Sequence, residues 1–449
     1  MTETPVVIHR SRSVAVQKST HFQFSEKDIP SEVNGSDLQD LREKAWKVYQ
    51  GQILPAANEE AWRRTDLSKL DPGQFSLVKN GSDSKISTPP DEILQPLTDK
   101  EHAGQIVLYG SSQSVQISKA LTDTGIVFST ISQLRETNPG LLSSIIGKIV
   151  KPEVNIFSSM VHAFGQDGVV LYVPANTKVD LPLHSVVWNS LEKSAYLSHI
   201  IVVLEENSEV TYIHESASPE GNTQPAFHAG VVEIHVGDNA KLQFVELQSF
   251  GKNVWNFTNE RARVESNGTI EWTFGAIGSH LTKNFTDLDL AGDGAVGKMS
   301  GFYFTNGKQH LDHDTQQNHL APNTTSDMLF KGALLENSRS VWQGMIYVAP
   351  GAQKTDGYQA NRNLILDKSA HADSLPGLEI LADDVRCTHG ATVGKIDPEE
   401  IFYLLSRGIP RKEAERLIVE GFFDPIMQRI PFEGVRNRFQ QYIHDKMAI

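Results

Sequence analysis

The sequence has very little cysteine: Cys387 is the only one among 449 residues. A single cysteine excludes an intrachain disulfide framework and is typical of proteins from reducing compartments. The first residues, MTETPVVIHRSRS, lack the apolar core of a signal peptide. No run of about 18 apolar residues occurs, so no membrane-spanning helix is expected. These absences predict a cytoplasmic protein.

A basic excess is also lacking. The formal net charge is −14, which disfavours binding to nucleic acid or to an anionic membrane surface. The chain has no Walker A sequence, no Gly-x-Ser-x-Gly, no His-Glu-x-x-His and no Cys-x-x-Cys. The glycines from Gly292 to Gly297 have no helical pattern after them, which predicts a turn between strands. Any use of ATP must therefore come from a partner.

Residues 1–150 are predicted to form a helix-rich N-terminal region, of which 1–35 is polar and irregular and is expected to be flexible. Ser36 and Gln39 form a candidate capping box for a helix that ends near Gly51. Further short helices are predicted over 58–64 and 140–150.

Residues 151–396 have a different pattern. Short segments in which apolar and polar residues alternate are separated by Gly, Asn, Asp and Pro. Val232, Ile234 and Val236 alternate with polar residues, for example. This pattern predicts an all-β unit. A sandwich, a barrel and a β-helix all remain compatible with it. The length without a helix makes the β-helix attractive, although no clean fixed-length repeat is visible.

Residues 397–449 are predicted to form a small helical domain. Asp397 is a candidate N-cap with Pro398 at the first helical position. A second helix should start near Pro410 and a third should cover 434–447. Such a domain could bind a partner or pack back onto the β unit, and the pattern alone favours neither.

Cys387 and His389 are the most informative pair in the chain. On a β-strand, residues i and i+2 share a face, so thiolate and imidazole would be neighbours. Together they suit iron or zinc, but they supply only two of the four ligands of a closed site. The remaining ligands would come from elsewhere in the chain or from a second chain. The alternative is an ordinary buried cysteine.

Asp383 could join this pair if the strand began before it. The sequence Ala-Asp-Asp reads better as a corner, which would turn Asp383 elsewhere.

A second candidate metal site comprises His310, Asp312 and Asp314, which would share one face of a strand. His319 could join it. The alternative is the solvated polar face of an ordinary strand.

The segment from Leu378 to Gly394, LEILADDVRCTHGATVG, resembles the SufB/SufD family of iron–sulfur cluster assembly proteins. The resemblance extends over most of 155–425. Residues that carry it further include Ala163–His184, His319, Pro322, Thr324, Lys331-Gly332, Gly344, Asn361–Leu366 and FYLLSRGIPRKEAERLIVEGF.

This resemblance implies a right-handed parallel β-helix between an N-terminal helical region and a C-terminal helical domain. It implies a non-enzymatic scaffold that pairs with the paralogue SufB and docks the ABC-type ATPase SufC. Iron or a cluster would be held transiently at a site shared with SufB, to which Cys387 and His389 contribute, and no cofactor would be held permanently. In isolation the chain could instead pair with a second copy of itself. The expected docking residues for the ATPase are Phe402, Leu405, Arg407, Gly408, Ala414, Leu417, Ile418 and Phe422.

Within the family, the chain resembles the SufD branch more than the SufB branch. SufB carries a sulfur-accepting cysteine upstream, and this chain has none before Cys387. SufB also typically has Glu after the matching histidine, where Gly390 stands here. A SufB-like scaffold remains the main alternative.

Two alternatives come from other classes of protein. A β-helical carbohydrate-active enzyme would need paired carboxylates, for which Asp287, Asp289, Asp312 and Asp314 are the candidates. A metal-dependent β-barrel enzyme would use His310, His313 and His319.

Overall fold

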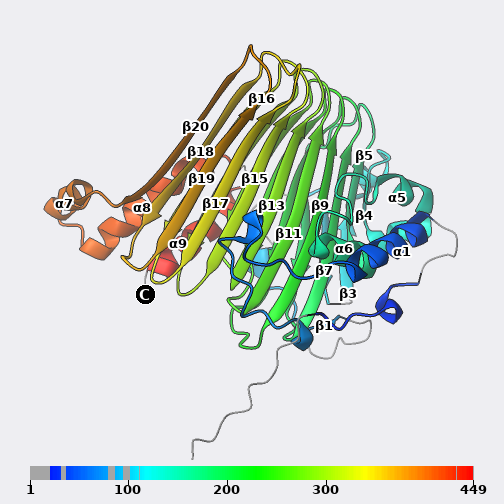
Figure 1. Ribbon diagram of the computed structural model, residues 1–449, viewed down its shortest axis with the longest axis horizontal. Coiled ribbons are helices and arrows are strands. Elements are labelled where there is room, and N and C mark those ends of the chain that lie inside the picture. Colours follow the sequence, from blue (N-terminus) through cyan, green and yellow to red (C-terminus); the bar gives the residue numbers. More distant parts are fainter. Residues whose placement is uncertain are drawn as a thin grey trace, which may run out of the picture.

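The computed structural model describes residues 21–31, 37–78, 86–94, 102–110, 112–430 and 432–447 (Figure 1). Strands hold 42% of the residues and helices 23%, so the chain is mainly β. The α-helices of the described part are α1 (Asp37–Gln50), α2 (Asp91–Leu94), α3 (Lys119–Thr122), α4 (Ile131–Thr137), α5 (Pro139–Ile145), α6 (Ile156–Phe164), α7 (Pro398–Ser406), α8 (Arg411–Met427) and α9 (Glu433–Met447). Short 3-10 helices are η1 (Glu26–Asp28), η2 (Glu60–Trp62) and η3 (Pro72–Gln74).

The strands form two long sheets. Sheet A contains β5 (Asp167–Val173), β7 (Ser194–Leu204), β9 (Ala226–Val236), β11 (Val254–Val264), β13 (Leu281–Leu290), β15 (His310–His319), β17 (Arg339–Val348) and β19 (His371–Ile380). Sheet B contains β6 (Leu183–Trp188), β8 (Glu209–Ala217), β10 (Lys241–Ser249), β12 (Thr269–Ala276), β14 (Val296–Thr305), β16 (Thr325–Leu334), β18 (Asp356–Ile365) and β20 (Arg386–Lys395). At the first edges, β4 (Val127–Thr130) joins sheet A, and β2 (Gly104–Tyr109) and β3 (Ser112–Ile117) join sheet B; β1 (Ser76–Leu77) pairs with β7.

From β5 onward, consecutive strands alternate between the sheets, and each strand up to β18 pairs in parallel with the strand two places further along the chain. The edge pairs β2–β3 and β4–β5 are antiparallel. The chain therefore winds as a β-solenoid of about eight turns. This confirms the expected β-helix and excludes the sandwich and the barrel. The coils differ in length: Trp255 pairs with Leu281 and Arg339 pairs with His371, and the partners in the second pair lie farther apart in the sequence.

Asparagine marks the turns that lead from sheet A into sheet B. These turns need a residue with positive φ, a conformation that Asn adopts more readily than other non-glycine residues. Five asparagines occupy it: Asn176, Asn207, Asn239, Asn267 and Asn323, with φ between 53° and 59°. Gly294 takes the same role where the series skips one coil, with φ 71°, which confirms that the Gly292–Gly297 segment is a turn.

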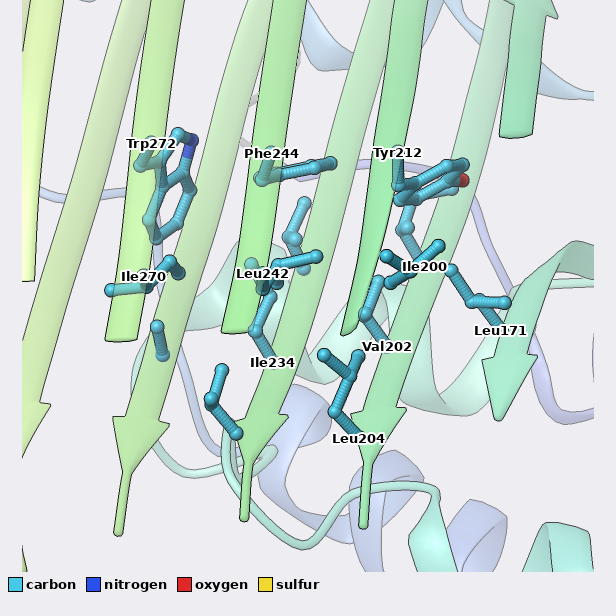
Figure 2. Packing of buried hydrophobic residues seen from close by; sticks show 14 of the residues in the cluster. Leu171, Ile200, Val202, Leu204, Tyr212, Ile234, Leu242, Phe244, Ile270 and Trp272 are labelled. Atoms are coloured by element: carbon cyan, nitrogen blue, oxygen red, sulfur yellow. The ribbon is translucent and has the colours of Figure 1, made fainter. Parts of the chain in front are cut away.

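The interior of the first coils is apolar because alternate residues of both sheets point into it. Figure 2 shows side chains from both sheets meeting there, with Leu171, Ile200 and Ile234 among them. Tyr212 and Phe244 stack at 5.5 Å between ring centroids, and Trp272 continues the row at 5.4 Å from Phe244. These rings are neighbours in strand register, so one ladder of aromatic residues runs across three coils.

The interior of the same coils also holds polar residues. Glu246 on β10 and Glu260 on β11 both face inward and are almost fully buried. Glu260 accepts hydrogen bonds from Asn284 and Thr286, and the indole of Trp272 donates to Glu246 at 3.2 Å. Burial raises the pKa of both carboxyls, that of Glu260 to about 7, and the contact with Glu260 raises the pKa of Glu246 further. The pair is therefore held together by a shared proton.

The two outer faces are covered by different parts of the chain. Helices α1 and α6 and the N-terminal segment lie on sheet A (Figure 1), where aromatic residues such as Trp62, Phe157 and Phe257 interlock. Helices α8 and α9 cover sheet B, where Phe439 meets Phe302 edge-on at 4.6 Å. The solenoid is thus wrapped by the N-terminal and C-terminal segments of the same chain.

The predicted helices are mostly found. The three C-terminal helices are confirmed, and the Asp397 carboxylate caps α7 by accepting from the Glu399 amide at 2.9 Å. The helix predicted over 140–150 ends earlier, at Ile145, and the one predicted over 58–64 is the short 3-10 helix η2. Ser36 and its capping box lie outside the described residues. Within the stretch expected to be flexible, Phe22 and Phe24 are buried against other aromatic rings.

The Glu246–Glu260 pair predicts an unusual pH dependence of stability. Both carboxyls have folded-state pKa values above the unfolded value, so their stabilisation is present below about pH 4.5 and is lost as the pH rises through the folded pKa values. Glu246→Gln mimics the protonated form. The free energy of unfolding of the variant minus that of the parent should rise by about 1 kcal/mol per pH unit between pH 5 and 7. Urea denaturation of both proteins measures this difference.

Glu271→Gln is the matched control, since Glu271 is exposed on the outer face of β12 next to Lys298. Its stability curve should run parallel to that of the parent. A parallel curve for Glu246→Gln as well would contradict the shared-proton interpretation.

Candidate functional site

The solenoid ends at β19 and β20, and this end has no cap within the described residues. Among the strands that the structure describes, β19 pairs only with β17, and β20 only with β18. Leu378, Ile380 and Val393 point toward the interior side, yet they are 37%, 37% and 49% exposed because no further coil covers them. Two unpaired strand edges with apolar side chains are a surface that readily accepts another strand.

Cys387 and His389 lie on this last coil. β20 begins at Arg386, so both are on a strand and share its inward face, as the spacing predicted. Cys387 is half-buried, whereas His389 is exposed. Asp383 lies in the turn between β19 and β20, which confirms the corner and removes Asp383 from this face.

The surroundings of Cys387 keep its thiol protonated. Burial raises the thiol pKa, and the Asp356 carboxylate raises it further, while the Gly357 amide opposes the shift by hydrogen-bonding to sulfur. Arg386 pairs with Asp356 at 3.4 Å. The sulfur is therefore accessible but is not a reactive thiolate at neutral pH.

His319 lies behind the cysteine, inside the solenoid. Its ring is fully buried, and its nitrogens contact the hydroxyls of Thr324 and Ser326, each at 2.8 Å. Burial lowers the imidazole pKa to about 4. The Cys387 sulfur and His319 Nε2 both border the backbone of Gly357.

Two buried glutamines also face the interior near this end. Gln359 is the register partner of His389, and Gln317 lies two residues before His319 on β15. The Gln359 side-chain oxygen and both amide atoms of Gln317 have no hydrogen-bond partner among the described residues, although both side chains are fully buried. Neither residue belongs to a motif that is visible in the sequence. The register between coils would have placed both glutamines near Cys387 and His389. This register cannot be read from the sequence because the coils differ in length.

The candidate metal site on β15 is not supported. His310, Asp312 and Asp314 do share one face, the outer one, but Lys283 of the neighbouring strand lies among them, with its Nζ 3.0 Å from Asp312 and 3.8 Å from Asp314. The hydroxyl of Thr65 also donates to Asp312. A buried ammonium thus occupies the place of a cation. No group of three or more His, Cys, Asp or Glu suited to a metal occurs among the described residues.

The two enzyme alternatives also lose their geometric basis. His313 and His319 point into the solenoid, whereas His310 points outward, so the three imidazoles cannot converge on one metal. The other carboxylates are neutralised by a neighbour: Arg261 pairs with Asp287 and lies 3.9 Å from Asp289. No open pair of carboxyls is left on this face, within the described residues, for acid–base chemistry.

The residues expected to dock an ATPase fall into two groups. Phe402, Leu405 and Leu417 are exposed by 73%, 40% and 37%, and α7 projects beyond the sheets (Figure 1). Arg407 and Gly408 are exposed at the turn that follows α7, and Ile418 is partly buried. Ala414 is fully buried and cannot be reached by a partner. Phe422 is held on the solenoid, where its carbonyl accepts from Lys331 at 2.6 Å.

Comparison with known proteins agrees with this architecture. The SufBD core domain of the SUF system for FeS cluster assembly matches residues 186–422, and the SufBD protein N-terminal region matches residues 15–184. The chain belongs to the SufB/SufD family.

Relatives in this family align over most of their length. The iron–sulfur cluster assembly protein SufD of Bacillus subtilis is 28% identical over 417 residues, which cover 90% of this chain and 95% of that protein. A SufBD family protein of Staphylococcus saprophyticus is 32% identical, with 82% of each chain covered. One from Staphylococcus haemolyticus is also 32% identical and covers 88% of this chain. As a SufB/SufD family member, the chain is an iron–sulfur cluster assembly protein. None of the described helices has the length and apolarity needed to span a membrane.

The raised thiol pKa predicts slow alkylation of Cys387 at neutral pH. Because thiolate is the reacting form, the rate with iodoacetamide should rise about tenfold per pH unit and level off only above pH 9. Mass spectrometry of the intact chain can follow this directly, since no other cysteine exists. A rate that is already maximal at pH 7 would show that the thiol is ionised.

Proposed function

We propose that the chain is a non-catalytic, SufD-like scaffold subunit of a cytoplasmic iron–sulfur cluster assembly complex. Its solenoid end would pair with a SufB-like paralogue, and its C-terminal helices would dock a SufC-like ABC-type ATPase. The observation that carries the proposal is the uncapped end of the solenoid, where unpaired strand edges and exposed apolar side chains surround Cys387 and His389.

Pairing at this end has a simple physical basis. Each edge strand presents free backbone N–H and C=O groups, and a partner strand can satisfy them while covering Leu378, Ile380 and Val393. A SufB-like partner built on the same solenoid would offer matching edges. In isolation, a second copy of this chain could take its place.

The cargo of the site would be iron or a cluster. Cys387 and His389 supply a soft thiolate and an imidazole, which suit iron. A cluster usually takes four protein ligands, so two must come from the partner. This requirement fits the absence of a complete metal-binding group among the described residues and makes assembly dependent on pairing.

The C-terminal helices are suited to transmit movement. Most of α7 and the first residues of α8, Arg411 and Lys412, are exposed, whereas the end of α8 and α9 are fixed to sheet B by apolar packing. Lys446 donates to the carbonyls of Ile277 and Phe304, and Arg438 binds Glu215 at 2.5 Å. An ATPase that moved α7 would therefore transmit force through α8 and α9 to sheet B.

Phe402→Asp tests ATPase docking. Phe402 is the most exposed large apolar residue of α7, and an aromatic anchor in an interface is typically worth about 2 kcal/mol or more, roughly thirtyfold in Kd. The variant should therefore lose co-purification with the SufC-like ATPase of the same organism, and titration should show the weakened Kd.

Ile53→Asp is the control, because Ile53 is 71% exposed in the N-terminal region. It should bind the ATPase as the parent does. Unchanged binding of both variants would place the ATPase elsewhere, whereas equal loss in both would point to a general effect of the added charge.

His389→Ala tests the shared site. Since His389 is exposed, its removal should leave the unfolding transition unchanged within about 0.5 kcal/mol. Iron and sulfide retained by the reconstituted complex should fall roughly tenfold. His444→Ala, an exposed histidine of α9, should retain both. Normal iron and sulfide content in the His389 variant would remove that residue from the site.

A further inference from the structure

The two strand edges at the open end of the solenoid differ in their backbone donors. At the start of β19, His371 donates to the Ser338 carbonyl at 3.1 Å, and just after the strand Leu381 donates to the Val348 carbonyl at 2.9 Å. Successive residues of a parallel strand bond to opposite sides, so the odd-numbered residues of β19 bond to β17 and the even-numbered residues point their N–H and C=O groups to the open edge. The edge-facing residues of β19 are therefore Ala372, Ser374, Pro376, Leu378 and Ile380.

Pro376 interrupts the edge of sheet A at its middle. Proline has no N–H, and within a sheet it is tolerated where that N–H would face away from the ladder, as it does here. Inside the solenoid, the Gln359 amide donates to the carbonyls of Gly344 and Gly377 at 3.3 Å and 2.8 Å, and Gly344 is the register partner of Pro376. A strand added to this edge would find no donor at its centre.

The edge of sheet B has no such interruption. Arg386 donates to the Thr355 carbonyl at 2.8 Å, so the even-numbered residues of β20 bond to β18 and the odd-numbered residues face the open edge. The edge-facing residues of β20 are Cys387, His389, Ala391, Val393 and Lys395. All five carry an N–H. Proteins commonly protect a lasting edge with proline, charge or a bulge, and this row has only the charge of Lys395 at its end.

We propose that Pro376 is a specificity-determining residue of the open end, which withholds the central donor of the sheet A edge and leaves β20 as the edge along which a partner strand pairs. The occupant is an extended strand of the SufB-like partner, with an unbroken row of backbone donors and acceptors. This inference rests on the proposed pairing and adds the edge that carries it. The backbone groups of Cys387 and His389 belong to the paired row, so the partner strand is bound beside the candidate site.

The same substitution on each edge tests this assignment. Ala391→Pro removes an edge-facing N–H from β20, and Ala372→Pro does so on β19, while the bonds to the preceding coil are made by the alternate residues. Ala391→Pro should weaken binding of the full chain to the SufB-like paralogue of the same organism about tenfold, because a backbone hydrogen bond is lost at the centre of the row. Ala372→Pro should leave the Kd unchanged. Titration with the purified paralogue measures both.

The converse variant needs no partner. Pro376→Thr restores the missing donor with a residue favoured in strands, so a second copy of the chain can pair along the edge of sheet A. Sedimentation velocity of the purified full chain should show self-association at concentrations about fivefold lower than for the parent. Ser374→Thr is the control, since it keeps both the N–H and the hydroxyl that donates to Asn361, and it should sediment as the parent does.

A greater loss of binding in Ala372→Pro, an equal loss in both proline variants, or unchanged self-association of Pro376→Thr would overturn the proposal. The first two results would leave the proposed function standing, since binding would still use an edge of the last coil. Unchanged binding of both proline variants would overturn the proposal and count against the proposed pairing as well. Urea unfolding of each variant alone identifies a loss of binding caused by misfolding, and Pro376→Thr then carries the test.

Discussion

The parallel backbone ladder between successive coils is the interaction on which the rest of the molecule depends. It fixes the register, and the register decides which side chains face the interior, which face outward and which meet across strands. The aromatic row of Tyr212, Phe244 and Trp272, the buried carboxyl pair and the space shared by Cys387 and His319 all follow from it. Because the ladder is extended by adding strands at one end, it also leaves that end with free hydrogen-bonding groups.

The all-β class could be predicted because alternation of apolar and polar residues is a local signal. The C-terminal helices could be predicted because their capping residues lie next to them in the sequence. The choice among all-β architectures could not be made from residues alone, because coils of unequal length blur any fixed repeat. In the sequence, the repeat is visible only as the asparagines at 176, 207, 239, 267 and 323, each of which marks the same positive-φ turn. The family resemblance, rather than periodicity, decided in favour of the β-helix.

The candidate site was predictable only in part. Cys387 and His389 are two positions apart, so strand alternation alone places them together. His319 and Gly357 reach the same point from two earlier coils, and only the register brings them there. The same long-range pairing explains why the candidate metal site on β15 is not supported. Its three residues do share a face, but Lys283 from the previous coil lies among them. The sequence could not show that a cation of the chain's own already lies there.

The uncapped end also bears on how such a subunit exists in a cell. A solenoid end that no described residue caps leaves backbone groups free, and the hydrogen bonds that would secure a partner are the same ones that would bind an unrelated strand. A partner strand and an unrelated strand would therefore compete for the same backbone groups. Within the described residues, this end of the solenoid is the place where a second polypeptide can add a strand.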